Sequence, residues 1–180
     1  MPAHRLPDLP GRVAIPVEHV NTAPAEDLRH LLLSCLHSLR WAGRVADHRP
    51  YPDASALLAA ADEAAYDLTP ADLAEALEAE SLPRLPDGAY SAAHTALNAA
   101  NAAYEARFGH VFVICLDEVP PDEALDRLLA AIRSRLANEP EEEREVAAEE
   151  LRRLARGRLV YALRDAKNPT TSQNGATPGQ

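Results

Sequence analysis

The chain has 180 residues, enough for one domain whose hydrophobic core needs no disulfides or metal ions. Hydrophobic residues make up 47% of it but aromatic residues only 4%, a composition that favours close-packed helices over a β-sheet. The formal net charge of −10 argues against broad binding to nucleic acids or anionic membranes, because both need basic surfaces.

The cysteines and the apolar runs indicate the compartment. Cys35 and Cys115 are too few for a disulfide framework, and each lies in an apolar run that predicts a buried thiol. No apolar run approaches the roughly 20 residues of a membrane-spanning helix. The opening residues, MPAHRLPDLPGR, lack the apolar core of a secretory signal. We therefore expect a cytoplasmic protein with no membrane partner.

Prolines, glycines and polar residues gather at the two ends of the chain. They predict a flexible N-terminal segment over residues 1–20 and a disordered tail over residues 166–180. The helical domain is expected between them, over residues 21–165.

Helical patterns dominate the first half of that domain. A helix is expected to begin between Thr22 and Pro24, with Thr22 as its cap, and its apolar spacing continues to Ala42. The segment RPYPD (49–53) interrupts the pattern, and ASALLAAADEAAYDL (54–68) resumes it. TPADLAEALEAE (69–80) opens a further helix with Thr-Pro and with acidic residues in its first turns, where the helix dipole favours them.

The second half begins with EAESLPRLPDGAYSAAHT (78–95), a segment whose prolines and glycine break the helical pattern. A long helix is then expected over residues 90–107, ended by Gly109. HVFVICL (110–116) is a single strand-like run, which predicts a buried extended segment or the first turn of a buried helix. Residues 120–138 and 140–163 complete an all-α, single-domain bundle of six to eight helices.

Three polar residues fall on faces that should be apolar. His94 and Asn101 lie on one face of the 90–107 helix, and Arg158 shares a stripe of the last helix with Tyr161. In a structural interpretation, the first two bond to neighbouring backbone and the arginine extends outward. In a functional one, His94, Arg158 and Glu80 line a pocket that binds and converts a small anionic substrate. Spacing alone leaves both interpretations open.

Other signals for a site are weaker. His30 and His37 have no carboxylate between them at a spacing suited to a metal ligand, so no metal site is expected. The glycines are scattered and form no phosphate-binding loop, and GHVFVIC contains no serine-centred nucleophile elbow. EPEEERE (139–145) is most simply an acidic helix start exposed to solvent.

Two segments, NAAYEARFGHVFVIC (101–115) and RLANEPEEEREVAAEELRRLARGRL (135–159), carry a resemblance to a known family. Over residues 21–163 the chain resembles the 2-oxo-4-hydroxy-4-carboxy-5-ureidoimidazoline (OHCU) decarboxylases, the third enzyme of urate conversion to allantoin. The matching residues, in order, are Asn101, Tyr104, Arg107, Phe108, Gly109, Phe112, Arg135, Leu136, Asn138, Arg158 and Leu159. Looser matches upstream are Asn21, Cys35, Trp41, RPY (49–51) and DLAEAL (72–77).

The resemblance implies an all-helical fold, usually a homodimer, that acts on a small anionic substrate without a metal or an organic cofactor. It also implies that Arg158 binds the substrate, and that Arg84, Ser91, Thr95 and Ile114 lie in the substrate-binding set.

The chain departs from the family where the family keeps its catalytic residues. The family has a His-Pro-Arg element, but here Pro83-Arg84 follows Leu82, and by the other register the histidine position is Glu80. The family also has Ser-x-x-Glu-Gln, but here Ser91 is followed by His94 at the glutamate and Thr95 at the glutamine. A histidine therefore stands where a carboxylate is expected.

Two functions remain. In the first, which we favour, the protein is a diverged carboxy-lyase in which His94 is the titrating group, Glu80 orients it and Arg158 anchors the substrate carboxylate. In the second, it is a catalytically silent or repurposed relative with a binding or scaffold role. Loss of a general acid or base typically costs about 10²-fold to 10⁴-fold in rate, which is the argument for the second.

Overall fold

The computed structural model describes residues 17–85 and 91–165; the flexible N-terminal residues 1–16 and the tail 166–180 that the sequence predicts lie outside them. Within the described residues the secondary structure is helical and contains no strand, so the all-α prediction is confirmed. The helices are α1 (Val17–Thr22), α2 (Ala25–Cys35), α3 (Leu39–Asp47), α4 (Ala54–Tyr66), α5 (Pro70–Glu78), α6 (Ser91–Phe108), α7 (Ala124–Arg135) and α8 (Pro140–Asp165).

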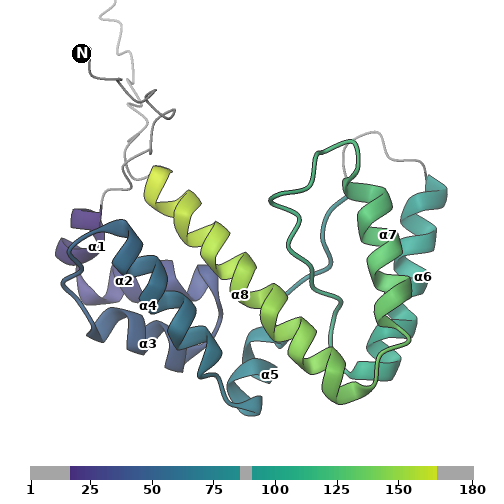
Figure 1. Ribbon diagram of the computed structural model, residues 1–180, viewed down its shortest axis with the longest axis horizontal. Helices are drawn as coiled ribbons and strands as arrows, with labels where there is room; N and C mark the ends of the chain where they lie inside the picture. Colours follow the sequence, from purple (N-terminus) through teal and green to yellow (C-terminus); the bar gives the residue numbers. More distant parts are fainter. Residues whose placement is uncertain (1–16, 86–90, 166–180) are drawn as a thin grey trace, which may run out of the picture.

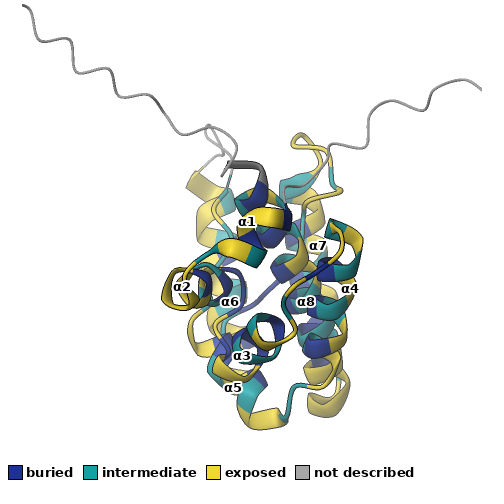
Figure 2. Cartoon of the chain, turned by 90° about the vertical axis from the view of Figure 1, so that its left-hand side faces the viewer, coloured by how far each residue is buried: buried dark blue, intermediate teal, exposed yellow. Residues whose placement is uncertain are grey.

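The longest helix, α8, runs diagonally across the molecule and connects its two sides (Figure 1). α1 to α4 gather at its C-terminal part, whereas α6 and α7 lie side by side, running in the same direction, beside its N-terminal part. α2 and α4 both pack against α8. The helices turn their buried residues inward and their exposed residues to the surface (Figure 2). This arrangement gives the domain two hydrophobic clusters, one on each side.

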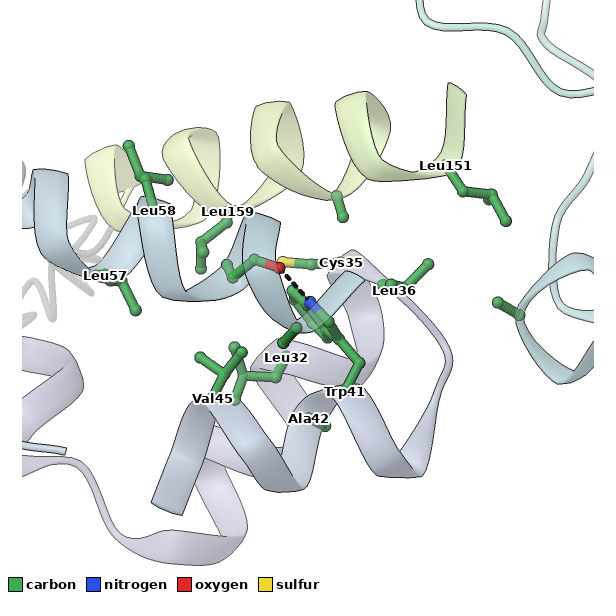
Figure 3. Packing of buried hydrophobic residues seen from close by; sticks show 14 of the residues in the cluster. Leu32, Cys35, Leu36, Trp41, Ala42, Val45, Leu57, Leu58, Leu151 and Leu159 are labelled. Atoms are coloured by element: carbon green, nitrogen blue, oxygen red, sulfur yellow. Dashed lines mark hydrogen bonds between the residues drawn. The ribbon is translucent and has the colours of Figure 1, made fainter. Parts of the chain in front are cut away.

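The larger cluster is centred on Trp41, which is fully buried among leucines of α2, α4 and α8 (Figure 3). The Trp41 indole Nε1 donates a hydrogen bond of 2.9 Å to the carbonyl oxygen of Ala61, so its polar group is satisfied inside the core. Cys35 lies in the same cluster and is 1% exposed, which confirms the prediction of a buried thiol at this position.

The smaller cluster lies between α6 and α7, and residues 110–116 run between the two clusters as an extended segment. Alternate side chains of this segment enter different clusters: Val113 joins the larger one, whereas Phe112 and Ile114 join the smaller one. A period of two is the property of an extended backbone, so HVFVICL forms the buried extended segment that was one of its two expected conformations.

The helix expected from Thr22 to Ala42 is in fact two helices. α2 ends at Cys35, and Ser38 caps α3 by accepting a hydrogen bond of 3.3 Å from the backbone N–H of Trp41. Because the apolar spacing continues through the break, the pattern concealed it, and only the Ser38 cap marked it. Leu39, expected on the buried stripe, is 62% exposed.

The N-terminal boundary also differs from the prediction. Residues 17–20, expected in the flexible segment, belong to α1, and Val17 and Val20 are buried against the larger cluster. Thr22 ends this helix rather than capping the next one, because its hydroxyl donates to the Glu18 carbonyl oxygen at 2.7 Å. Pro24 occupies the cap position of α2 without a side-chain hydrogen bond.

The buried stripe of α8 is not the one that the sequence suggested. The stripe that contains Arg158 leads to Tyr161, which is 66% exposed. The helix instead buries a row at four-residue steps, formed by Ala147, Leu151, Ala155, Leu159 and Leu163. Arg158 thus lies beside the core, at the edge of a cavity.

Candidate functional site

A cavity of about 280 Å³ opens between the segment after α5, the extended segment and α8. Its volume is close to the lower end of the range for small-molecule sites, which suits a single small ring. The residues that line it are Glu80, Ser81, Leu82, Pro83, Arg84, Val113, Ile114, Leu116, Asp117, Leu154 and Arg158.

The main polar feature of this cavity is the ion pair of Arg158 with Glu80. Arg158 Nη1 lies 2.7 Å from Glu80 Oε1, and Nη2 lies 2.9 Å from Oε2, so the pair is bidentate. The side chain of Glu80 is 9% exposed and that of Arg158 is 38% exposed. The hydrogen bonds to Glu80 raise the pKa of Arg158, so the guanidinium remains charged.

Different elements place the two partners. Arg158 projects from α8, and its Nη1 donates a further hydrogen bond of 3.1 Å to the carbonyl oxygen of Cys35 at the end of α2. Glu80 follows α5, where its backbone N–H donates to the Leu77 carbonyl oxygen at 3.2 Å. Residues 80–85 then continue without regular secondary structure, as the prolines in this stretch predict. The arginine is therefore held by two helices, and the glutamate is carried by a loop.

The wall formed by the extended segment is held by side chains from three helices. Asn101 of α6 accepts a hydrogen bond of 3.1 Å from the Phe112 N–H, and Arg135 of α7 donates one of 2.6 Å to the Val113 carbonyl oxygen. Glu150 of α8 accepts from the Cys115 N–H at 2.6 Å. Three backbone groups of the extended segment find partners in this way, and Ile114 of the same segment lines the cavity. Asn101 thus fits the structural interpretation of its place on the α6 face.

A buried polar network that we did not predict lies behind this wall. Arg135 and Glu143 form an ion pair, with Arg135 Nε 2.8 Å from Glu143 Oε1, and both Arg135 and Glu143 are buried. The hydroxyl of buried Tyr104 donates to the same carboxylate oxygen, and Asn138 Nδ2 donates to the other at 2.9 Å. Burial, with the hydrogen bond to Glu143, raises the pKa of Tyr104, so the phenol stays protonated and remains a donor.

Glu143 corrects the interpretation of EPEEERE as a solvent-exposed helix start, because its side chain is 0% exposed. The neighbouring Glu141, 86% exposed, behaves as expected. Within an acidic run nothing in the sequence distinguishes the two. The sequence held only an indirect indication of a buried carboxylate. The family pattern includes Tyr104, Arg135 and Asn138, and all three donate hydrogen bonds to Glu143.

The structure brings together four of the seven predicted site residues and separates the other three. Glu80, Arg84, Ile114 and Arg158 all line the cavity. The remaining three are Ser91, His94 and Thr95, on the first two turns of α6. All three are exposed, and none of them lines this cavity.

The expected pairing of His94 with Glu80 is not present in this structure. Both Glu80 oxygens bind Arg158, and His94 is exposed on α6. The hydroxyl of Thr95 is bonded within its own helix, to the Ser91 carbonyl oxygen at 3.0 Å. His94 was placed on a core face by its spacing from Leu97, but burial of α6 begins only at Leu97.

A larger, open cavity of about 1030 Å³ borders the first and shares Asp117, Leu154 and Arg158 with it. Gly157 allows this approach of the two walls, because the Asp117 carboxylate lies where a Cβ at position 157 would stand. Cys35 and Cys115 line the larger cavity, and burial raises the pKa of both thiols, so neither is a ready nucleophile.

The described residues contain no group of three or more His, Cys, Asp and Glu side chains positioned to hold a metal ion. None of the helices in the described ranges is long and apolar enough to span a membrane.

Comparison with known proteins identifies the family. The family model described as OHCU decarboxylase matches residues 21–91 and 85–160, which together include the cavity, the smaller hydrophobic cluster and most of the larger one. The chain belongs to the OHCU decarboxylase family. The two matched pieces overlap within residues 85–91, which lie between the two departures from the family pattern, at residues 80–82 and 94–95.

Individual relatives agree with this assignment. A 2-oxo-4-hydroxy-4-carboxy-5-ureidoimidazoline decarboxylase from Amia calva is 43% identical over 63 residues, which are 35% of this chain and 34% of the relative. A crystal structure of OHCU decarboxylase in the presence of (S)-allantoin matches with a TM-score of 0.66 and 21% identity, over 79% of this chain and 100% of that one.

A crystal structure of (S)-allantoin synthase matches with a TM-score of 0.63 and 23% identity, over 81% of this chain and 53% of that one. At these identities the two structures show that the OHCU decarboxylase fold is shared. The chain spans about a third of the length of the Amia relative and about half of the allantoin synthase chain.

Proposed function

We propose that this protein is a carboxy-lyase of the OHCU decarboxylase type, acting on a small carboxylated ureidoimidazoline or a related ring. The observation that carries the proposal is Arg158, a permanently charged guanidinium at a ring-sized cavity in a chain of this family. Arg84 lines the same cavity and supplies a second positive charge for an anionic substrate.

The proposed reaction is a decarboxylation followed by protonation of the ring. The carbon–carbon bond to the substrate carboxylate breaks, CO₂ leaves, and the electron pair of that bond remains on the ring until a proton is delivered to a ring carbon. The protein must hold the carboxylate, keep water from solvating it, and carry one proton. Leu82, Ile114 and Leu154 line the cavity with apolar surface, which supports the second requirement.

Within this cavity, Glu80 and Asp117 are the carboxylates that can carry the proton. Glu80 has the stronger claim, because it is bonded to Arg158, and a substrate held by this arginine would meet Glu80 first. His94 remains the alternative acid/base group that its position in the sequence suggested. That role would need the first turns of α6 to approach the cavity, which His94 does not line here.

A second candidate function is a catalytically silent or repurposed binding module. The observation in its favour is also at Arg158: the chain places a glutamate on the arginine and lacks a histidine at the family's histidine position. A module of this kind would bind a small ligand at the cavity and release it unchanged.

Family membership also supports a homodimer, and we propose a cytoplasmic homodimer with no nucleic-acid or membrane partner and no metal or organic cofactor. The exposed Tyr161 at the rim of the larger cavity is an apolar surface that a second copy could cover. Light scattering after size exclusion would measure the mass of the particle against 19.5 kDa for one chain.

The test is turnover of freshly generated OHCU, followed by circular dichroism for enantiopure allantoin above the spontaneous racemic background. We expect a signal that persists in the presence of EDTA. Arg158→Lys should lower kcat/KM by about 10-fold to 100-fold, because a lysine cannot reproduce the bidentate contact. Arg156→Lys is the matched control, since Arg156 lies on the same helix but pairs with Asp62. A folded protein that shows no signal would favour the silent module.

A further inference from the structure

The Glu80–Arg158 pair occupies the position that an anionic substrate would need. A guanidinium presents one fork for planar, two-oxygen recognition of a carboxylate, and Glu80 uses both of its oxygens on that fork. Glu80 therefore makes the contact that a carboxylated ligand would make. Its side chain is 9% exposed, so it lies within the cavity rather than across its mouth.

The arginine and the glutamate are not held equally. Arg158 keeps a hydrogen bond to the Cys35 carbonyl oxygen that does not involve Glu80, and its backbone is inside the long helix α8. Glu80 lies beyond the end of α5, and within the described residues both hydrogen bonds of its carboxylate are to Arg158. When a competing anion arrives, the glutamate can leave without disturbing a helix, whereas the arginine stays in place.

We propose that Glu80 is a specificity-determining residue that acts as a resident competitor for Arg158: a carboxylated ring binds by displacing it, and a neutral ring does not. The proposal rests on the proposed function in one respect, that the natural displacing ligand is the carboxylated substrate.

Isothermal titration calorimetry with a pair of probes tests the proposal on the full chain. The probes are hydantoin-5-acetate, which carries a carboxylate on a five-membered ureide ring, and 5-methylhydantoin, which does not. Glu80→Gln and Glu80→Ala should each bind hydantoin-5-acetate at least about tenfold more tightly than the wild type, because an internal charge-assisted competitor is removed. Affinity for 5-methylhydantoin should stay within about twofold, since it has no carboxylate for Arg158.

Asp117→Asn is the matched control, because it removes one negative charge from the same cavity without removing a hydrogen bond to Arg158. It should strengthen hydantoin-5-acetate binding by less than about threefold, the effect of a partly screened charge. Equal gains in Asp117→Asn and Glu80→Gln would overturn the proposal, because general electrostatics would then explain both. Weaker binding in both Glu80 variants would also overturn it and would make Glu80 a ligand contact.

The experiments can contradict the two proposals separately. If the protein shows no turnover but the Glu80 variants bind hydantoin-5-acetate more tightly, only the proposed reaction is contradicted. If the protein shows turnover but the Glu80 variants bind with unchanged affinity, only the competitor role of Glu80 is contradicted.

Discussion

Within the part of the chain that the structure describes, the Arg158 guanidinium makes three hydrogen bonds, two to Glu80 and one to the Cys35 carbonyl oxygen. An arginine at the edge of a core needs such partners, because a charge left without them would be costly to bury. The sequence left open whether this residue lines a polar pocket, and the structure places it at a cavity together with three other predicted site residues. The identity of its partner could not be predicted, because Glu80 and Arg158 are 78 positions apart in the chain.

A substitution at His94 distinguishes the two candidate proton carriers, Glu80 and His94. We expect His94→Ala to keep kcat/KM for OHCU within about twofold of the wild type, because His94 is exposed and does not line the cavity. The measurement is the circular dichroism assay with matched protein concentrations. Loss of at least about 10²-fold would instead restore His94 as the general acid or base.

At the scale of single elements, α5 has the most complete start of any helix with a described cap. Thr69 accepts a hydrogen bond from the Asp72 N–H, and Asp72 accepts one from the Thr69 N–H, so the two residues form a capping box. α5 ends two residues before Glu80, so a well-defined helix helps to fix the position at which the cavity loop begins.

The capping box should make stability depend on pH. Hydrogen bonds from Thr69 lower the pKa of Asp72 below its ordinary value near 3.8. The stabilisation is therefore present above that value and is lost as the pH falls through the lowered pKa of the folded state. We expect Asp72→Asn to reduce the free energy of unfolding at pH 6 by about 1 kcal/mol and much less at pH 2 to 3.

Urea unfolding at the two pH values measures this difference. Glu78→Gln on the same helix is the control, because Glu78 is exposed and takes no part in the cap. An equal loss at both pH values would show that the Asp72 carboxylate charge does not contribute.

For the extended segment 110–116, the sequence indicates the conformation but not the residues that bond to its backbone. Its β-branched and aromatic residues predicted either a buried extended segment or the first turn of a buried helix, and the structure shows the first of these. A lone strand has no neighbour to satisfy its backbone, and the chain solves this with Asn101, Arg135 and Glu150. Those partners come from three different helices, so local pattern could not identify them.

For the whole molecule, the buried network around Glu143 connects the α6–α7 pair to the start of α8. Glu143 lies in the first turn of α8, Tyr104 on α6 and Arg135 on α7. The Arg135 guanidinium also lies over the Phe112 ring, with its carbon 4.4 Å from the ring centroid. Three helices and the cavity wall therefore meet at one carboxylate.

Removal of that charge should destabilise the domain. We expect Glu143→Gln to lower the free energy of unfolding by about 3 kcal/mol, because it leaves the Arg135 charge buried without its partner. Glu141→Gln, in the same turn of α8 but exposed, should cost less than about 0.5 kcal/mol. Chemical unfolding of both variants checks the difference, and similar losses in the two would mean that the network contributes nothing specific.

The elements that the sequence predicted well are those whose signals are local. Thr69-Pro70 marked the start of α5 and Gly109, with a positive φ of 82°, marked the end of α6. The break between α2 and α3 was missed because apolar residues continue through it. Glu143 was missed because its burial depends on Tyr104 and Arg135, which only the fold brings to it.

By itself the sequence determined the helical class, the order of most helices and the resemblance to the OHCU decarboxylases, since composition, periodicity and capping act over a few residues. Only the tertiary structure decided which polar residues meet. It paired Glu80 with Arg158, placed Glu143 in the core and left His94 at the surface. The reason is physical: burial and ion pairing depend on the packing of helices far apart in the chain, and spacing along one helix does not contain that information.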